Sequence, residues 1–236
     1  AQPSSQASRS TNSLFPFSDT EQTDPETGRT DGLMSRMASR GQLPKVMFVN
    51  TSSEYWGGHG ALMHIDIGGG RDLTPLDPIR IYLLGGTQHG VDPLPLNDRN
   101  TAEGYRAQQL FNCLDCRPLL RAALVNLDRW VTTGQAPPPS RHPRIDDGTA
   151  VPPERVGDTF RAIPGVSFPR HLRQFTRLDF GPDAGVPSKL PPAVGKPYPR
   201  LVAAVDRDGN ELAGIRLPFI TVPLAAYTGW NLRHAD

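Results

Sequence analysis

The sequence predicts an α/β fold in which helices cover a short parallel sheet. Two apolar runs indicate the sheet, because Val46–Val49 and Ile79–Leu84 are short, continuously apolar and followed by polar or glycine-rich turns. Strands that are buried on both faces of a parallel sheet have this pattern. A third observation indicates the covering helix, since apolar residues recur at spacings of three and four between Leu119 and Val131. This order of elements is typical of α/β domains.

The composition limits the classes of partner. The 236 residues include 25 Pro and 23 Gly, about a fifth of the chain, which predicts long ordered loops and few helices. A formal net charge of +1 gives no electrostatic basis for binding nucleic acid or a membrane surface. No apolar run approaches the ~18 residues that a membrane span requires. We therefore expect no nucleic acid and no membrane among the partners.

The start of the chain gives no information about the cellular compartment. The sequence begins at Ala1 without a Met, so we expect a processed or truncated product. The absence of a signal peptide therefore does not assign a location, and export to the periplasm or the medium stays one open reading.

We divide the chain into three segments. Residues 1–41 form an irregular N-terminal loop segment in which the apolar group Leu14–Phe17 pins the loop to the body, Asp24–Gly28 forms a turn, and a short helix covers Leu33–Arg40. Residues 42–135 form the α/β core portion.

The helix in this core portion has clear end signals. We expect Asp115 as its N-cap, Pro118 in its first turn and Gly134 at its end. Its broad apolar face should pack on the sheet and consists of Leu119, Leu120, Ala123, Leu124, Leu127, Trp130 and Val131.

Residues 136–236 are expected to form an extension that wraps the core. The extension opens with a polyproline-like stretch, QAPPPSRHP. Two β-like runs follow, Leu201–Val205 and Ile215–Val222, and the turn sequence Asp206–Asn210 lies between them. We expect a small sheet here. Between the two core strands, Ala61–Asp66 fits either a helix or a strand.

A carboxylate and a histidine follow the two core strands. Glu54 comes just after the first strand and His89 just after the second. A sheet fixes the separation of two such turns, so the carboxylate can orient one imidazole nitrogen while the other faces a nucleophile. In α/β-hydrolases the triad acid and histidine occur in this order, and a helix follows them. We predict that Glu54 and His89 are two members of a catalytic triad.

Several long stretches resemble a bacterial α/β-hydrolase domain family of largely uncharacterised serine esterases. They are PKVMFVNTSSEYW, IRIYLLGGTQHG, RPLLRAALVNLDRWV with GQAPPPSRHPRIDDGT, LAGIRLPFITVPLAAYTGWN, and the leader LFPFSDTEQTDPETGRTDGL. The resemblance covers nearly the whole chain and aligns it with the C-terminal half of that family: the last strands of the sheet, the packing helix and a C-terminal extension. It implies Glu54 as the acid, His89 as the general base, no cofactor, and a nucleophilic Ser upstream.

The sequence departs from an intact member because it contains no G-x-S-x-G motif. The nearest stretch, Gly165–Pro169, lacks the second Gly and follows the histidine instead of preceding it. Ser52 and Ser53 lie too close to Glu54 to serve as an elbow nucleophile and are expected to shape its turn. This chain alone therefore lacks the nucleophile, and the missing N-terminal half of the same protein is the expected partner.

Other candidate residues have simpler interpretations. Cys113 and Cys116 are compatible with a local disulfide, with two ordinary thiols or, least favoured, with a redox or zinc site. The spacing of His59, His64 and Asp66 matches no standard metal site. The turns at Asp146–Gly148 and Asp206–Asn210 lack the Glu that closes a calcium loop. We therefore predict no metal site.

Three aromatic residues are expected to serve mainly in packing. Tyr55 and Trp56 could wall an acyl pocket next to the acid, although packing is favoured. Trp230, together with Asn231, is expected to dock the C-terminus.

Three functional hypotheses follow. The first is the C-terminal portion of a serine hydrolase acting on a small carboxylic ester. The second is a non-catalytic hydrolase-like module that binds a ligand or serves a structural role. The third, a metal-dependent enzyme, is the least favoured. The first predicts that the Glu54 carboxylate lies within ~3.5 Å of a His89 ring nitrogen.

Overall fold

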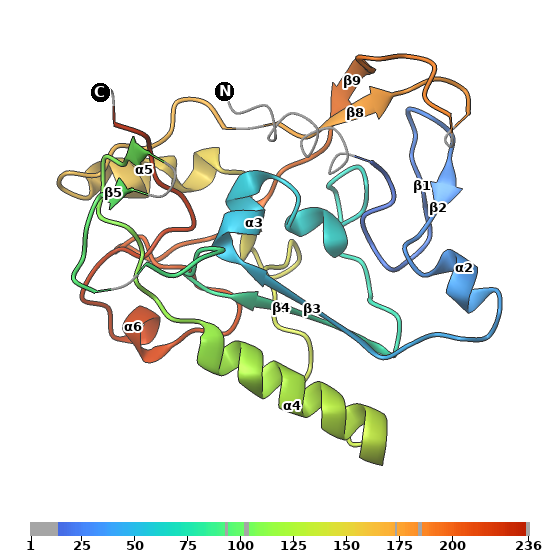
Figure 1. Cartoon of the computed structure of the whole chain (residues 1–236), viewed down its shortest axis with the longest axis horizontal. Helices are drawn as coiled ribbons and strands as arrows, with labels where there is room; N and C mark the ends of the chain where they lie inside the picture. The colour runs from blue at the N-terminus through green and yellow to red at the C-terminus, as the bar shows by residue number, and fades with distance from the viewer. Residues whose placement is uncertain (1–13, 93, 102–103, 173, 184–185, 235–236) are drawn as a thin grey trace.

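A computed structural model describes residues 14–92, 94–101, 104–172, 174–183 and 186–234. Its centre is a parallel pair of strands, β3 (Val46–Thr51) and β4 (Ile79–Leu84). The six-residue helix α3 (Ser52–Gly57) continues directly from β3, and the long helix α4 (Arg117–Thr133) crosses below the pair (Figure 1).

The two predicted core strands are confirmed. They pair in parallel from Val46 opposite Ile79 to Thr51 opposite Leu84. On its other side, β4 receives two isolated parallel bridges, from Arg141 to Tyr82 and from Ile215 to Leu84. Within the part of the chain that the structure describes, β4 is the only strand paired with β3.

The predicted helix is confirmed as α4, although its N-terminal cap differs from the prediction. Cys116 occupies the cap position, while Asp115 accepts a hydrogen bond from the backbone N–H of Arg117 at 2.9 Å. Gly134 ends the helix with a φ of 78°, a left-handed conformation that suits glycine.

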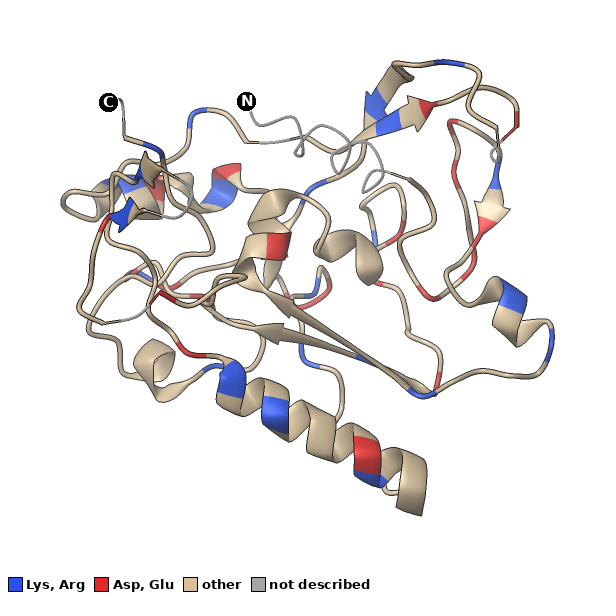
Figure 2. Ribbon diagram, viewed as in Figure 1, with Lys and Arg blue, Asp and Glu red and all other residues tan. Residues whose placement is uncertain are grey.

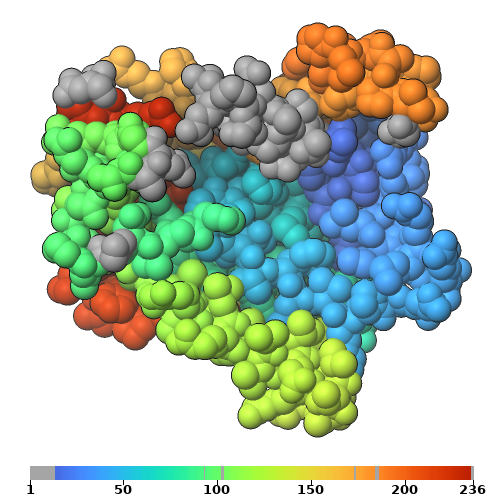
Figure 3. Space-filling model, viewed as in Figure 1, coloured from blue at the N-terminus to red at the C-terminus, as the bar shows by residue number. Residues whose placement is uncertain are grey.

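The expected packing of the apolar face of α4 on the sheet is confirmed only in part, because some residues of that face are buried or half-buried and others are exposed. Trp130 is the buried residue of the helix, whereas Leu124 is 67% exposed and Val131 is 60% exposed. A groove of about 240 Å³ separates α4 from the strands, because the helix approaches β3 without closing on it. In Figure 3, α4 stands out from the body of the molecule.

The remaining strands form four short antiparallel pairs. These are β1 (Gln22–Thr23) with β2 (Thr30–Asp31), β5 (Arg99–Asn100) with β6 (Tyr105–Arg106), β7 (Ala150–Val151) with β10 (Val202–Ala203), and β8 (Thr176–Asp179) with β9 (Ala193–Pro197). The other helical elements are α2 (Ser35–Ala38), the 3-10 turn Ala61–Met63, α5 (Glu154–Ala162) and α6 (Pro218–Thr221).

Three of the N-terminal predictions agree with the structure, although β1 and β2 pair within the segment that was predicted to be irregular and residues 1–13 lie outside the described part of the chain. Phe15 is buried and Phe17 packs edge-on against Tyr198, so the apolar group does pin this segment. The turn from Asp24 to Gly28 closes with a 2.8 Å backbone hydrogen bond. Helix α2 lies within the predicted Leu33–Arg40 helix but is shorter.

The second β-like run of the extension was wrongly predicted. Within Ile215–Val222, Ile215 bridges β4, but Pro218–Thr221 forms helix α6. Pro218 stands at the start of that helix, where its fixed φ and missing N–H are tolerated. In the first run, Leu201–Val205, the strand covers Val202–Ala203 alone. The hairpin turn between the runs is confirmed, because Val205 bridges Glu211.

The extension shares its core with the rest of the chain. One cluster joins Phe15 and Tyr55 to Leu201 and Ala203, and a second joins Trp56 to Phe160 and Val202. The division into three segments stays a prediction.

Figure 2 shows positions of acidic and basic residues spread along the described ribbon. Among the described residues, no helix combines the length and apolar character needed to cross a membrane.

Candidate active site

The ends of β3 and β4 bring Glu54 and His89 to one edge of the sheet. Thr51 and Leu84, the last residues of the two strands, pair with each other. Glu54 lies in the first turn of α3, and His89 follows the tight turn at Gly85–Gly86. Gly86 has a φ of 68°, and a Cβ there would lie 2.3 Å from Ile220 Cδ1. Glycine is therefore required where the chain turns toward the site.

Glu54 and His89 are in direct contact. His89 Nδ1 lies 2.9 Å from Glu54 Oε1, within the predicted distance. The second carboxylate oxygen, Oε2, accepts the backbone N–H of Thr51 at 2.6 Å and the Thr51 hydroxyl at 2.5 Å. Burial opposes ionisation of Glu54, but the hydrogen bonds from Thr51 and His89 outweigh it and lower the pKa of the carboxyl.

This contact fixes the chemical form of the imidazole. An ionised carboxylate only accepts hydrogen bonds, so His89 Nδ1 must donate. In the neutral ring, Nε2 then carries a free lone pair. The His89 side chain is 90% exposed, whereas that of Glu54 is 19% exposed. The pair thus presents a proton acceptor to the surface and keeps its acid partner largely covered.

The nearby serines shape the turn, as predicted. Ser53 Oγ accepts the backbone N–H of His89 at 2.7 Å, and Ser52 Oγ donates to Glu211 Oε2 at 2.6 Å. Ser167, in the stretch closest to a G-x-S-x-G motif, lies in an exposed loop after helix α5. This is not the strand–turn–helix that exposes an elbow nucleophile.

A second carboxylate, which was not predicted from the sequence, lies close to the two turns that carry the pair. Glu211 is 3% exposed, and its Oε2 atom also accepts the backbone N–H of Gly86 at 2.8 Å. Its Oε1 atom is buried without a hydrogen-bond partner. Burial raises the pKa of Glu211 to about 7, against the opposing effect of the hydrogen bonds from Ser52 and Gly86.

A groove begins next to the histidine. Gln88, which immediately precedes His89, lines a cavity of about 310 Å³. Its walls are largely apolar and include Leu96, Leu110, Phe111 and Tyr227. Gln88 is itself held in place because its side-chain amide donates to the carbonyl of Thr228 at 3.1 Å. The groove can accommodate an apolar group near the turn that carries His89.

Tyr55 and Trp56 do not line this groove. Tyr55 is fully buried, and its hydroxyl lies 2.9 Å from His64 Nε2. Trp56 packs against Phe160 and Trp230 in an aromatic cluster. The packing role favoured for Tyr55 and Trp56 is therefore confirmed.

The C-terminus is docked by Asn231. Its side-chain amide donates to the Gln109 carbonyl at 2.9 Å, and its oxygen accepts the Gln109 N–H at 3.3 Å. Trp230 contributes both to the aromatic cluster and to the groove wall. The docking role predicted for Trp230 and Asn231 is consistent with these contacts.

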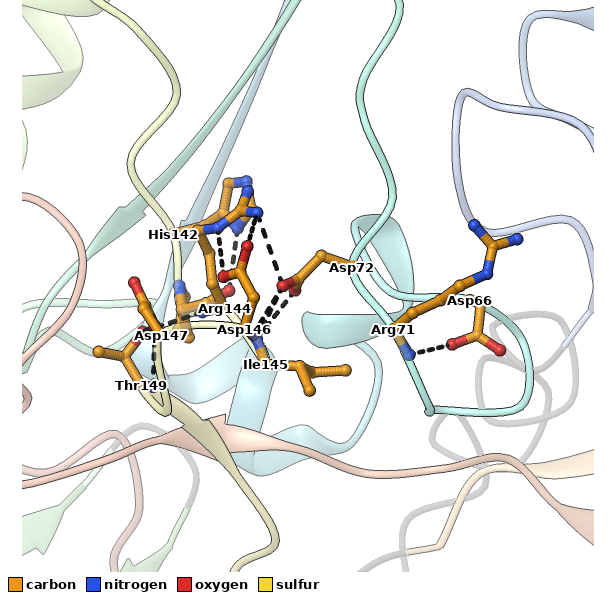
Figure 4. Close-up of polar contacts among 10 residues, drawn as sticks. Asp66, Arg71, Asp72, His142, Arg144, Ile145, Asp146, Asp147 and Thr149 are labelled. Atoms are coloured by element: carbon orange, nitrogen blue, oxygen red, sulfur yellow. Dashed lines mark hydrogen bonds and ion pairs between the residues drawn. The ribbon is translucent and has the colours of Figure 1, made fainter.

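The residues of the metal hypothesis are engaged elsewhere. His64 stacks on His142 with ring centroids 4.1 Å apart, and burial lowers its pKa well below the usual value. Asp66 accepts backbone N–H groups of its own turn, among them that of Arg71 at 2.6 Å (Figure 4). His59 packs against the ring of Phe175. Within the described ranges, no group of three His, Cys, Asp or Glu residues could hold a metal ion.

The Asp-rich turns are ordinary turns. Asp147 accepts the N–H and hydroxyl of Thr149, while Arg144 pairs with Asp72 and Asp146 (Figure 4). In the second turn, Asp206 Oδ1 accepts the backbone N–H groups of Asp208 and Asn210.

Cys113 and Cys116 are free thiols, so the disulfide interpretation is not supported by the structure. Cys116 is buried and precedes α4, and burial raises the pKa of its thiol. Cys113 lies in the wall of the groove.

Comparison with known proteins gives one match. The model of the family described as "Alpha/beta hydrolase domain" matches residues 7–235. A search of curated proteins and a search of solved structures each found no match. The matched region includes both strands, the Glu54–His89 pair and the groove. The chain belongs to the alpha/beta hydrolase domain family.

Proposed function

We propose that this chain carries the acid and base of a serine hydrolase that acts on small carboxylic esters. The family match supports a hydrolase-type function. The observation that carries the finer proposal is the 2.9 Å contact between Glu54 Oε1 and His89 Nδ1, with the imidazole otherwise exposed. No cofactor is part of the proposal.

The chemistry assigns a separate task to each residue. His89 Nε2 removes the proton from a serine hydroxyl as the serine oxygen attacks the ester carbonyl carbon. The same imidazole then donates that proton to the departing alcohol, which leaves an acyl-serine. In the second half-reaction His89 removes a proton from water as the water oxygen attacks the acyl carbon, and it returns that proton to the departing serine oxygen, which releases the carboxylic acid and restores the serine. Glu54 holds the tautomer and stabilises the imidazolium that forms in each half-reaction.

The nucleophile is proposed to lie in an upstream segment of the same protein. The sequence printed here has no G-x-S-x-G motif, and the two serines next to Glu54 are engaged in its turn. Two features support the docking of such a segment. Among the described strands, β3 pairs with β4 alone, and three residues of the apolar face of α4 are exposed, namely Leu120, Leu124 and Val131.

The groove that begins at Gln88 is proposed to receive the apolar part of the ester. Its volume of about 310 Å³ is at the lower end of ligand pockets, which favours a small substrate. Because its lining is mostly apolar, we expect neutral esters to be preferred over charged ones.

Labelling with a fluorophosphonate tests the proposal. The intact protein should be labelled at a serine upstream of these 236 residues, and His89→Ala should remove most of the labelling. His234→Ala is a suitable control, because that histidine lies near the C-terminus and outside the pair. The labelled serine is identified by mass spectrometry of peptides.

Two results would contradict the proposal. Labelling that His89→Ala leaves unchanged would reject the base role of His89. An intact protein that has no G-x-S-x-G motif and takes up no label would favour the alternative, a non-catalytic binding or structural module.

A further inference from the structure

The buried carboxylate of Glu211 joins the two turns that carry the pair. Its Oε2 atom accepts the hydroxyl of Ser52 at 2.6 Å and the backbone N–H of Gly86 at 2.8 Å. Ser52 is the first residue of α3, two residues before Glu54. Gly86 belongs to the turn that leads to His89. One oxygen atom therefore connects the acid-bearing helix to the histidine-bearing turn.

The two hydrogen-bond donors that Glu211 accepts are shielded from water. Ser52 is fully buried, and Glu211 is 3% exposed, so water does not readily satisfy these donors. A buried N–H or hydroxyl without a partner is costly, and this cost keeps both turns against the same acceptor. A Cβ on Gly229 would lie 2.5 Å from the Ser52 Cβ, so the C-terminal segment also confines Ser52.

The geometry keeps the bridge in either protonation state of Glu211. Both hydrogen bonds use Oε2, and Oε1 is buried without a partner. A proton on Oε1 would leave both accepted hydrogen bonds in place. Because burial raises the pKa of Glu211 to about 7, both states are populated near neutral pH. A glutamine, whose amide oxygen can take the place of Oε2, should preserve the bridge.

We propose that Glu211 is a positioning residue that sets the separation between Glu54 and His89. It does not touch the reacting atoms and acts only by holding the Ser52 and Gly86 ends of the two turns. The proposal deepens the function proposed above and rests on it for its catalytic consequence. Its structural consequence, the alignment of the imidazole with the carboxylate, can be measured without any reaction.

The structural test follows the tautomer of His89 by NMR. Ring ¹³C and ¹⁵N shifts are recorded at about pH 9, where ordinary imidazoles are neutral. The unaltered protein should hold His89 mainly as the Nδ1–H tautomer, and Glu54→Ala should lose this preference. Glu211→Leu, which keeps the side-chain size but removes the acceptor, should resemble Glu54→Ala. Glu211→Gln should retain the unaltered tautomer.

Asp19→Leu is the matched control. Asp19 is a buried carboxylate whose Oδ2 accepts the Leu76 N–H at 2.6 Å, and Leu76 precedes the start of β4, at the opposite end from His89. This variant should lose stability without changing the His89 tautomer. If Glu211→Leu does not fold, Ser52→Ala replaces it, because that variant removes one of the two bonds. It should give a tautomer ratio between those of the unaltered protein and Glu54→Ala.

The catalytic test uses ester hydrolysis by the intact protein. Glu211→Leu should lower kcat by about 100-fold, the loss that a displacement of about 1 Å can cause, and leave KM nearly unchanged. Glu211→Gln should restore most of kcat. An unaltered His89 tautomer in folded Glu211→Leu, or in Ser52→Ala if Glu211→Leu is unfolded, would overturn the positioning role. Absence of hydrolysis by the unaltered protein would reject the proposed function, while the tautomer measurement still decides the role of Glu211.

Discussion

Thr51 holds one oxygen of Glu54 with both its backbone N–H and its hydroxyl, at 2.6 Å and 2.5 Å. Thr51 is at once the last residue of β3 and the N-cap of α3, so the same contact caps the helix. Glu54 therefore divides its two oxygens between separate tasks: Oε2 closes the cap, and Oε1 accepts from His89. The carboxylate is thus oriented by the local structure of the helix start as well as by its long-range contact with His89.

Thr51→Val tests this division. Valine keeps the shape but removes the hydroxyl, so the pKa of Glu54 should rise toward its usual value. The folded protein should lose about 1 kcal/mol of stability, as for a lost N-cap. We expect kcat/KM for an ester to fall about tenfold, and the acidic limb of its pH profile to move to higher pH. The measurements are urea unfolding at neutral pH and a pH–rate profile.

The lowered pKa of Glu54 determines the direction in which stability changes with pH. A carboxyl with a depressed folded-state pKa stabilises the fold above its ordinary pKa, and this stability is lost as the pH falls through the folded value. Thr51→Val should reduce that stability. Thr23→Val is the control, because the Thr23 hydroxyl pairs with the Thr30 hydroxyl at an exposed site. An unchanged acidic limb in Thr51→Val would contradict the role of this contact.

The sequence was sufficient to predict the Glu54–His89 contact because that contact follows from local signals. Each residue comes shortly after an apolar run, and parallel strands that are neighbours end at the same edge. The turn chemistry after each run is visible in the sequence as well, in the serines before Glu54 and the glycines before His89. The observed strands and the observed positions of Glu54 and His89 therefore agree with the prediction from the sequence.

Glu211 could not be found in the same way. Its partner Gly86 lies 125 residues away in sequence, and no periodic pattern encodes such a contact. The one available signal was a glutamate at the end of a hairpin turn and before an apolar run, ELAGIRL, a position that is commonly exposed. The exposure of Leu124 was missed for a related reason. Periodicity identifies an apolar face but does not reveal what covers it.

The raised pKa of Glu211 predicts a dependence of stability on pH. Its ordinary value is 4.5, and burial raises the folded-state pKa to about 7. The folded state thus binds the proton more tightly than the unfolded state. This contribution is complete below about pH 4.5 and is lost as the pH rises through about 7, with a total change on the order of 3 kcal/mol.

Glu211→Gln isolates this contribution. Urea unfolding of the unaltered protein between pH 5 and pH 8 should include a decline that the variant lacks, since glutamine does not ionise. The free energies of unfolding of the two proteins should therefore diverge as the pH rises, with the variant the more stable at about pH 8. Glu154→Gln, at an exposed position in α5, should leave the decline intact. Parallel pH profiles for the unaltered protein and Glu211→Gln would show that Glu211 ionises normally.

Under the proposed esterase function, the groove that begins at Gln88 predicts which esters are preferred. Leu110 lines the groove and is 56% exposed, so Leu110→Asp places a charge on the wall that an apolar group would contact. For an ester with a hexanoyl group, kcat/KM should fall about tenfold, while an acetyl ester should be little affected, because it does not reach the groove wall. Leu190→Asp is the matched control, since Leu190 is 74% exposed and does not line the groove.

Steady-state kinetics of the two esters with the intact protein give the comparison. An equal loss for both esters would place the effect of Leu110→Asp on the Glu54–His89 pair instead of on substrate binding. No loss for either ester would mean that the acyl group binds elsewhere.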